Sequence, residues 1–270
     1  LDISWRDPDQ VKKKLPGMYH QFKELAAVDI TVEKMEVGPT AHYVMGGIKV
    51  HPETQETTVP RMFAAGEAAT GLHGANRLGG NSLSDLIVFG KIAGEHAALV
   101  AKKLSDFLVI NPVEIEESIK ETLAPLTRKE GENPAKVVED LREMMQNKVG
   151  IIRTEKLLKE ALQDLDDLEI RSHKTSAGDS RIYNPGWHQA LEIEAMLDVS
   201  RMCALAALHR EESRGGHTRD DFPIPDYKHW GKINSVITKK DGMSIEHRSY
   251  PPIDEELKKL LDTEDLYEEE

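Results

Sequence analysis

The chain has 270 residues, 31% of them charged and 5% aromatic, and a formal net charge of −13 at pH 7. This length is sufficient for a large core and two structural units, and the acidic balance argues against a protein that wraps nucleic acid. The single cysteine, Cys203, excludes an intrachain disulfide and a multi-cysteine metal site. No uncharged apolar stretch approaches the length of a membrane span, so we expect no direct membrane insertion.

The first residues, LDISWRDPD, are typical of a strand end followed by a polar turn rather than of a natural N-terminus. We therefore expect the chain to be a piece of a longer protein. Residues 8–28 have apolar positions at helical spacing that Pro16 and Gly17 interrupt, which predicts two short helices joined by a turn. Residues 40–50 combine β-formers with a Gly-Gly pair, which predicts strands around a tight turn.

Residues 58–67, TVPRMFAAGE, predict a short buried strand that ends at Gly66-Glu67. Ligands of open α/β sheets bind at the carboxyl edge of the strands. Glu67 is therefore a candidate to accept hydrogen bonds from sugar or ribitol hydroxyls. The alternative is an ordinary strand-to-loop transition with a solvated glutamate.

Residues 71–83, GLHGANRLGGNSL, place four glycines and an arginine directly before an apolar run. That run predicts a helix from Ser82 to about Leu104, buried on most sides and capped by Asn81 or Ser82. Glycines let backbone approach a ligand, the guanidinium of Arg77 matches a carboxylate, and the unpaired N–H groups of a helix start attract an anion. A surface salt bridge and plain helix capping are the alternatives.

The second half of the chain predicts a helical bundle followed by a β-hairpin. Amphipathic patterns and punctuation by Asn-Pro pairs and glycine predict helices at 113–129, 132–149, 152–168 and 187–212. Residues 233–250 predict two strands joined by an Asp-Gly turn. The composition of the chain changes near residue 105, which suggests a domain boundary there.

His42 lies between β-forming residues and a Gly-Gly pair, so it is more accessible than a core histidine would be. Taken alone, such a histidine is more often structural than catalytic. The other histidines lack metal-ligand spacing, so we predict no metal site, and no G-x-G-x-x-G motif occurs in the chain.

Three of these segments together resemble the C-terminal portion of the flavoprotein subunit of succinate dehydrogenase and fumarate reductase. They are PTAHYVMGGI at 39–48, MFAAGEAATGLHGANRLGGNSLSDLIVFGKIAGEHA at 62–97, and HREESRGGHTRDDFP at 209–223. L-aspartate oxidase, a related flavoenzyme with a similar GLHGANR segment, matches more loosely elsewhere and is the alternative. The resemblance implies an α/β plus α fold: a partial, Rossmann-like FAD-binding domain over residues 1–103, and a helical bundle with a small C-terminal β-hairpin over residues 104–270.

The resemblance also implies roles for five residues. Glu67 matches the acidic residue that binds the ribitol of FAD, and Ser82 and Leu83 match backbone contacts to the isoalloxazine ring. His42 and Arg77 match the residues that hold the carboxylate groups of the substrate. The implied reaction moves a hydride between flavin N5 and the C2–C3 bond of succinate or fumarate. Gly80 stands where many members have serine, and the loop after Glu67 is slightly shorter than in many members; neither departure removes a contact.

The family's N-terminal dinucleotide motif, its FAD-linking histidine and the capping domain with the proton-donating arginine have no counterpart in this chain. We therefore expect no catalytic residue here, and partnership with an N-terminal portion of the flavoprotein and with an iron–sulfur subunit. The implied location is cytoplasmic, or peripheral on the cytoplasmic face of the inner membrane through partner subunits. A helical interaction module without activity is the non-enzymatic alternative.

Overall fold

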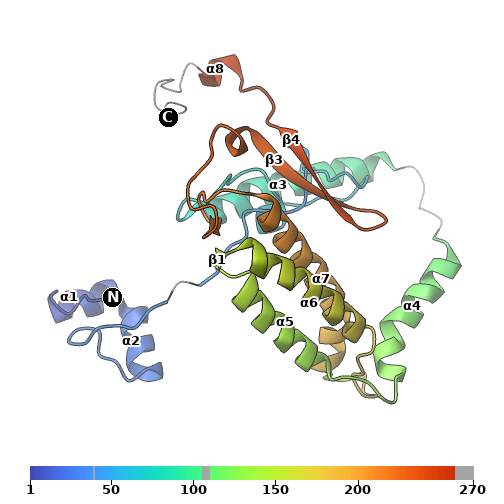
Figure 1. The fold of residues 1–270 in the computed structure, drawn as a ribbon, viewed down its shortest axis with the longest axis horizontal. Coiled ribbons are helices and arrows are strands. Elements are labelled where there is room, and N and C mark those ends of the chain that lie inside the picture. The colour runs from blue at the N-terminus through green and yellow to red at the C-terminus, as the bar shows by residue number, and fades with distance from the viewer. Residues whose placement is uncertain (39, 105–109, 259–270) are drawn as a thin grey trace. The chain divides into compact units, whose positions relative to one another are not determined.

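A computed structural model describes residues 1–38, 40–104 and 110–258 of the chain. The chain forms two compact units, Leu1–His42 and Tyr43–Glu270. Figure 1 labels the elements in chain order. The domain boundary expected at residues 103/104 stays a prediction.

The first unit contains the two short helices that the sequence predicts. Helix α1 spans Pro8–Lys14 and α2 spans Pro16–Leu25, each with a proline in its first turn. The carboxylate of Asp7 caps α1 by accepting from the backbone N–H of Gln10 at 2.9 Å. The small core of this unit consists of the buried side chains of Val11, Ile30 and Met35.

The second unit begins with irregular backbone where the sequence predicts strands. Single bridges pair Ile48 with Ala69 and Glu56 with Phe63, and a short 3₁₀ helix, η1, spans Gly66–Ala68. The prediction of a buried strand at 58–67 is therefore wrong in this structure. A strand is stable only beside strands that pair its N–H and C=O groups. This segment has only an isolated bridge, at Phe63, among the described residues.

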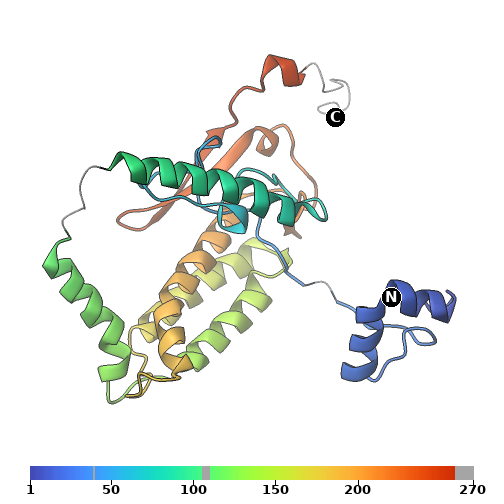
Figure 2. The same ribbon diagram turned by 180° about the vertical axis from the view of Figure 1, so that it is seen from behind.

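Helix α3, Asn81–Lys103, is continuous and starts at the glycine-rich loop (Figure 2). Its span confirms the predicted helix, but its environment does not. Asp85 and Ala93 are its buried residues, whereas the side chains of Leu83 and Ile87 are 68% and 74% exposed. In the described chain α3 packs mainly against η1, so most of its apolar surface has no cover there.

The helical bundle confirms the predicted helices. Helix α4 spans Pro112–Thr127, α5 Pro134–Lys148, α6 Glu155–Ser172 and α7 Pro185–His209. Asparagine or threonine side chains cap all four helices at their N-termini. Helices α5, α6 and α7 share one core, which includes Val137, Leu141, Leu158, Leu165, Ile193 and Leu197.

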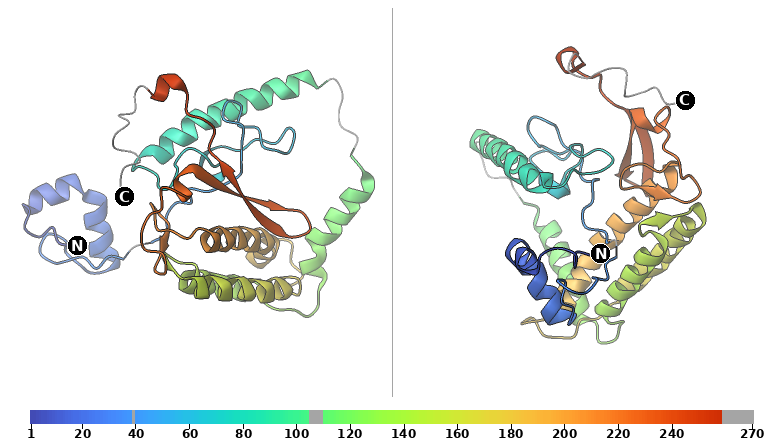
Figure 3. Two further views of the ribbon diagram at one scale, coloured as in Figure 1. Left: turned by 45° about the horizontal axis from the view of Figure 1, so that its top comes forward. Right: turned by 90° about the vertical axis from the view of Figure 1, so that its left-hand side faces the viewer.

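The remaining elements are short or belong to the hairpin. Strands β1, Ile152–Arg153, and β2, Thr218–Arg219, pair in parallel. A 3₁₀ helix, η2, spans Trp230–Lys232. Strands β3, Ile233–Lys239, and β4, Met243–Ser249, form the predicted antiparallel hairpin (Figure 3). A last turn of helix, α8, covers Glu255–Lys258.

Candidate functional site

The glycine-rich loop joins η1 to α3 and carries the predicted arginine. The backbone at Gly80, directly before α3, has φ of +87°, a left-handed conformation that favours glycine. No side chain of the described residues caps the first turn of α3, so the predicted capping by Asn81 or Ser82 is wrong. The first N–H groups of a helix have no partner within the helix, and those of Ser82 and Leu83 belong to this uncapped first turn.

Arg77 is half-buried in this loop. Its guanidinium carbon lies 4.6 Å from the centroid of the Tyr43 ring, a cation–π distance, and its Nη1 donates to the carbonyl of Leu78 at 3.3 Å. Its Nε is buried and has no hydrogen-bond partner among the described residues. Because an unpaired buried donor is costly, Arg77 has capacity to bind an acceptor that the described chain does not supply.

A buried cluster that the sequence analysis missed lies beside Arg77. His73 Nε2 is 3.2 Å from both Tyr43 Oη and Asp85 Oδ2, and Tyr43 Oη is 3.3 Å from the same carboxylate oxygen. The side chains of His73 and Asp85 are 9% and 6% exposed. Burial and the nearby carboxylate of Asp85 raise the pKa of the Tyr43 hydroxyl, which keeps it a hydrogen-bond donor.

One sequence signal points to this cluster. Asp85 is an acid within an apolar run that predicts a buried helix, and a buried carboxylate requires partners. Those partners come from segments 12 and 42 residues earlier in the chain. Helical periodicity does not reveal contacts over such separations, because it describes only one helix at a time.

Glu67 is exposed and belongs to η1. Its Oε1 accepts from the backbone N–H of Val44 at 2.9 Å, which orients the carboxylate. The 3₁₀ helix η1 packs against α3, where the side chain of Leu86 lies beside Gly66. In the described chain the expected sheet edge is absent around Glu67, but the residue retains a hydrogen-bonded, accessible carboxylate.

His42 is exposed and is the last residue of the first unit. The structure therefore groups Glu67, Arg77, Ser82 and Leu83 in the second unit and leaves His42 in the first. No group of three or more His, Cys, Asp or Glu side chains suited to a metal ion occurs within residues 1–38, 40–104 and 110–258. Over that same part of the chain, every helix is too short or too polar to cross a bilayer.

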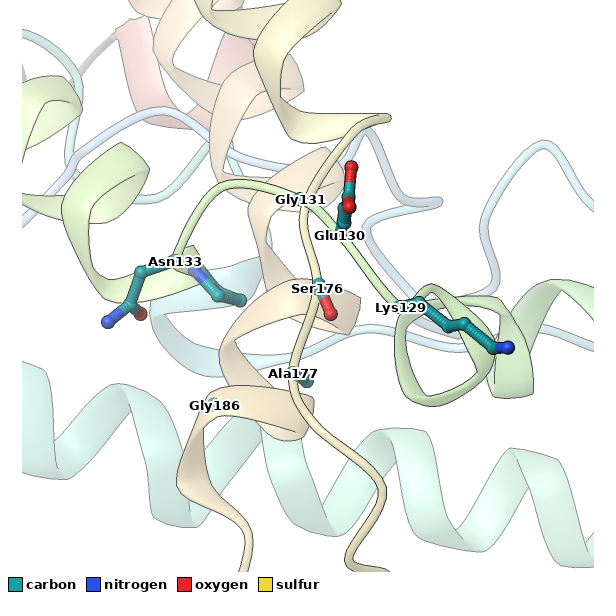
Figure 4. A pocket seen from close by; sticks show the side chains of 8 residues that line it. Lys129, Glu130, Gly131, Asn133, Ser176, Ala177 and Gly186 are labelled. Carbon is teal, nitrogen blue, oxygen red and sulfur yellow. The ribbon is translucent and has the colours of Figure 1, made fainter.

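The helical bundle also has an open polar hollow of about 510 Å³ (Figure 4). It is lined by Lys129, Glu130, Gly131, Asn133, Pro134, Ser176, Ala177 and Gly186. None of the predicted site residues lines it. The hollow is therefore separate from the site around Arg77.

Two family models match the chain. The model described as FAD binding domain matches residues 1–83, and the model described as Fumarate reductase flavoprotein C-term matches residues 138–261. Together they include residues 39–48, 62–83 and 209–223 of the three segments that carry the sequence resemblance.

Named relatives agree with these models. The fumarate reductase flavoprotein subunit of Escherichia coli is 35% identical, over 82% of this chain and 37% of that protein. The succinate dehydrogenase flavoprotein subunit of Coxiella burnetii is 35% identical, over 90% of this chain and 42% of that protein. The structure of Mycobacterium smegmatis Sdh1 in complex with UQ1 is 45% identical with a TM-score of 0.83, over 93% of this chain and 43% of that one.

The chain thus spans about two-fifths of the length of the curated relatives it matches. FAD is the cofactor of this group, since the matching N-terminal model is an FAD-binding domain. On these grounds the chain belongs to the family of succinate dehydrogenase and fumarate reductase flavoprotein subunits.

Proposed function

We propose that this chain is the C-terminal portion of an FAD-dependent oxidoreductase subunit that interconverts succinate and fumarate. The observation that carries the proposal is Arg77, whose buried Nε has no partner among the described residues and whose loop directly precedes an uncapped helix. A guanidinium with donors to spare binds a carboxylate through charge-assisted hydrogen bonds. Arg77 would hold one carboxylate of the dicarboxylate, and His42 the other.

The residues of the second unit fit an FAD-binding role. The first-turn N–H groups of Ser82 and Leu83 have no side-chain cap within the described chain and would donate to the isoalloxazine ring. The exposed carboxylate of Glu67 would accept from the ribitol hydroxyls. FAD bound there supplies the hydride acceptor or donor of the reaction. The chain's own contribution is to bind, orient and polarise the dicarboxylate.

The remaining parts of the enzyme would come from partners. The exposed apolar side chains of α3, among them Leu83 and Ile87, fit a helix that an N-terminal portion of the FAD-binding domain covers. In this proposal residues 1–103 complete that domain and residues 104–270 form the helical domain. Electrons would pass to an iron–sulfur subunit, and the flavoprotein would lie in the cytoplasm, free or attached to the inner membrane through partner subunits.

The test is an Arg77→Ala substitution in the complete FAD-loaded flavoprotein. Loss of a charged carboxylate ligand is expected to lower kcat/KM for succinate by at least about 10²-fold, with FAD content unchanged. Arg142→Ala, on an exposed surface of α5, is the matched control and should keep the parent value. Normal succinate turnover in Arg77→Ala would refute the substrate role.

The choice of substrate is tested in the same preparation. Succinate should reduce bound FAD, whereas L-aspartate, the substrate of the alternative flavoenzyme, should not. Rapid reduction by L-aspartate with none by succinate would favour the alternative.

A further inference from the structure

The turn Arg214–His217 touches the backbone of the glycine-rich loop two residues before Arg77. The N–H of Gly216 donates to the carbonyl of Ala75 at 2.9 Å. Gly215 has φ of +62°, and a Cβ placed on it would lie 2.2 Å from the Ala75 carbonyl oxygen. Backbone packs directly on backbone here, and only glycine allows both the conformation and the approach.

Buried charged groups hold this turn in place. Glu212 is fully buried and accepts from Arg210 Nη1 at 2.5 Å, from Arg214 Nε at 3.1 Å and from the backbone N–H of Asp226 at 2.9 Å. The turn itself closes with a hydrogen bond of 2.9 Å from the Arg214 N–H to the His217 carbonyl. A buried carboxylate with three donors is costly to displace, so the turn is a firm support.

Two further side chains connect the turn to the helical bundle. His217 Nε2 lies 3.0 Å from the Arg210 carbonyl and its Nδ1 lies 3.0 Å from Arg153 Nη1. Arg219, 1% exposed, donates to the carbonyls of Ala207 and Leu208 at the end of α7. The contact on Ala75 is therefore anchored in the bundle.

We propose that Gly215 and Gly216 are positioning residues for Arg77. This inference rests on the proposed function, in which Arg77 binds a dicarboxylate. The glycines around Arg77 allow its loop many backbone conformations, and the docked turn selects one of them by fixing the Ala75 carbonyl. In this arrangement the helical domain sets the geometry of a substrate-binding arginine that lies outside it.

The experiment is Gly215→Ala in the complete FAD-loaded flavoprotein. The added methyl group would force the Ala75 backbone away, and misplacement of a positioning group by an ångström costs up to about 10²-fold. We expect the KM for succinate to rise roughly tenfold, with a smaller loss in kcat. Malonate is a dicarboxylate without the C2–C3 bond on which the reaction acts, so it serves as an unreactive probe of binding. Its affinity, measured by the change in flavin absorbance, should fall to a similar extent, and the FAD content should not change.

Gly178→Ala is the matched control. Gly178 also has left-handed backbone, with φ of +74°, but a Cβ there meets no atom within 4 Å. The Gly178→Ala variant introduces the same kind of backbone strain but no clash with Ala75. Its KM for succinate should therefore equal that of the parent. A Gly215→Ala variant whose KM lies within about twofold of the Gly178→Ala value would overturn the positioning role.

A second variant covers the case in which Gly215→Ala does not fold. Arg214→Lys removes the hydrogen bonds that the Arg214 guanidinium donates to Glu212 and to the Trp230 carbonyl, so it loosens the turn without adding a clash. We expect its KM for succinate to rise about threefold; an unchanged KM would overturn the proposal. Arg77→Ala in the same assay separates the two ideas. Normal succinate turnover in Arg77→Ala refutes the proposed function. If Arg77→Ala loses turnover while Gly215→Ala keeps the parent KM, only the positioning role is refuted.

Discussion

The helical bundle buries a core of apolar side chains, whereas the glycine-rich segment with α3 leaves many of its apolar side chains exposed. In the bundle, Leu158, Leu165 and Ile193 are completely buried between three helices. On α3, Leu83 and Ile87 remain mostly exposed, although the helix is longer than α5 or α6. The bundle is stabilised by its own core, whereas α3 presents a surface suited to a cover from elsewhere. The candidate site lies in the region of the glycine-rich segment and α3, where apolar side chains are exposed.

The largest effect expected from this contrast is on stability. Leu165→Ala should lower the free energy of unfolding by about 2–5 kcal/mol, because it leaves a cavity in a closed core. Ile87→Ala, at a side chain 74% exposed, should change it by less than about 0.5 kcal/mol in this chain. Urea denaturation followed by circular dichroism measures both.

The same pair of variants also tests the proposed cover of α3. In the complete flavoprotein, Ile87→Ala should become destabilising by about 1–3 kcal/mol, because the side chain would then be buried. An Ile87→Ala variant that is equally neutral in the chain and in the complete protein would argue that nothing packs on this part of α3.

The two regions also differ in how much of them the sequence predicts. The helices of the bundle follow from apolar spacing and Asn-Pro caps, because these signals are local. The composition of residues 58–67 predicts a strand. A strand, however, depends on pairing with other strands, and a short stretch of sequence does not show whether they are present. Likewise, the contact of Gly215 with Ala75 joins residues far apart in the chain, and no local pattern indicates it.

The resemblance selects five site residues, of which the structure places four in the second unit, namely Glu67, Arg77, Ser82 and Leu83, and leaves His42 in the first. A donor of Arg77 has no partner among the described residues. The resemblance does not indicate the Tyr43–His73–Asp85 cluster, whose members come from three segments. Composition and the resemblance indicate a candidate loop, whereas the side chains packed around that loop depend on tertiary contacts.

A pH effect is expected at the ion pair between Arg219 and Asp221, which follows the turn Arg214–His217 in the chain. The guanidinium of Arg219 lowers the pKa of the Asp221 carboxyl from 3.8 to about 2. Because the folded-state pKa is the lower one, the pair stabilises the fold fully above about pH 4 and loses that contribution as the pH falls toward 2. The contribution is on the order of 1–2 kcal/mol after allowance for partial exposure.

Denaturation of the parent and of Asp221→Asn between pH 7 and pH 3 measures this contribution. The difference in stability between them should shrink as the pH falls, because protonation makes the parent resemble the variant. A difference that stays constant over this range would show that the ion pair with Arg219 does not carry the effect.

A smaller effect is expected at the cluster beside Arg77. Tyr43→Phe removes the hydroxyl contacts with His73 and Asp85 but keeps the ring under the guanidinium. The loss should be about 0.5–1.5 kcal/mol of stability, with little change in the affinity of the complete enzyme for malonate. Tyr43→Leu also removes the cation–π contact, so it should weaken malonate binding; equal affinities for the two variants would mean that the ring does not orient Arg77.

The smallest effect concerns the exposed ion pair between the hairpin and the bundle. Lys239 Nζ lies 2.6 Å from Asp198 Oδ2, with side chains 49% and 32% exposed. Lys239→Met should cost less than about 1 kcal/mol at low salt, and the cost should fall as salt screens the pair. Denaturation at two salt concentrations measures it. Because β3 and β4 pair through their own backbone, a loss above about 2 kcal/mol would mean that this contact, rather than the apolar core, secures the hairpin on α7.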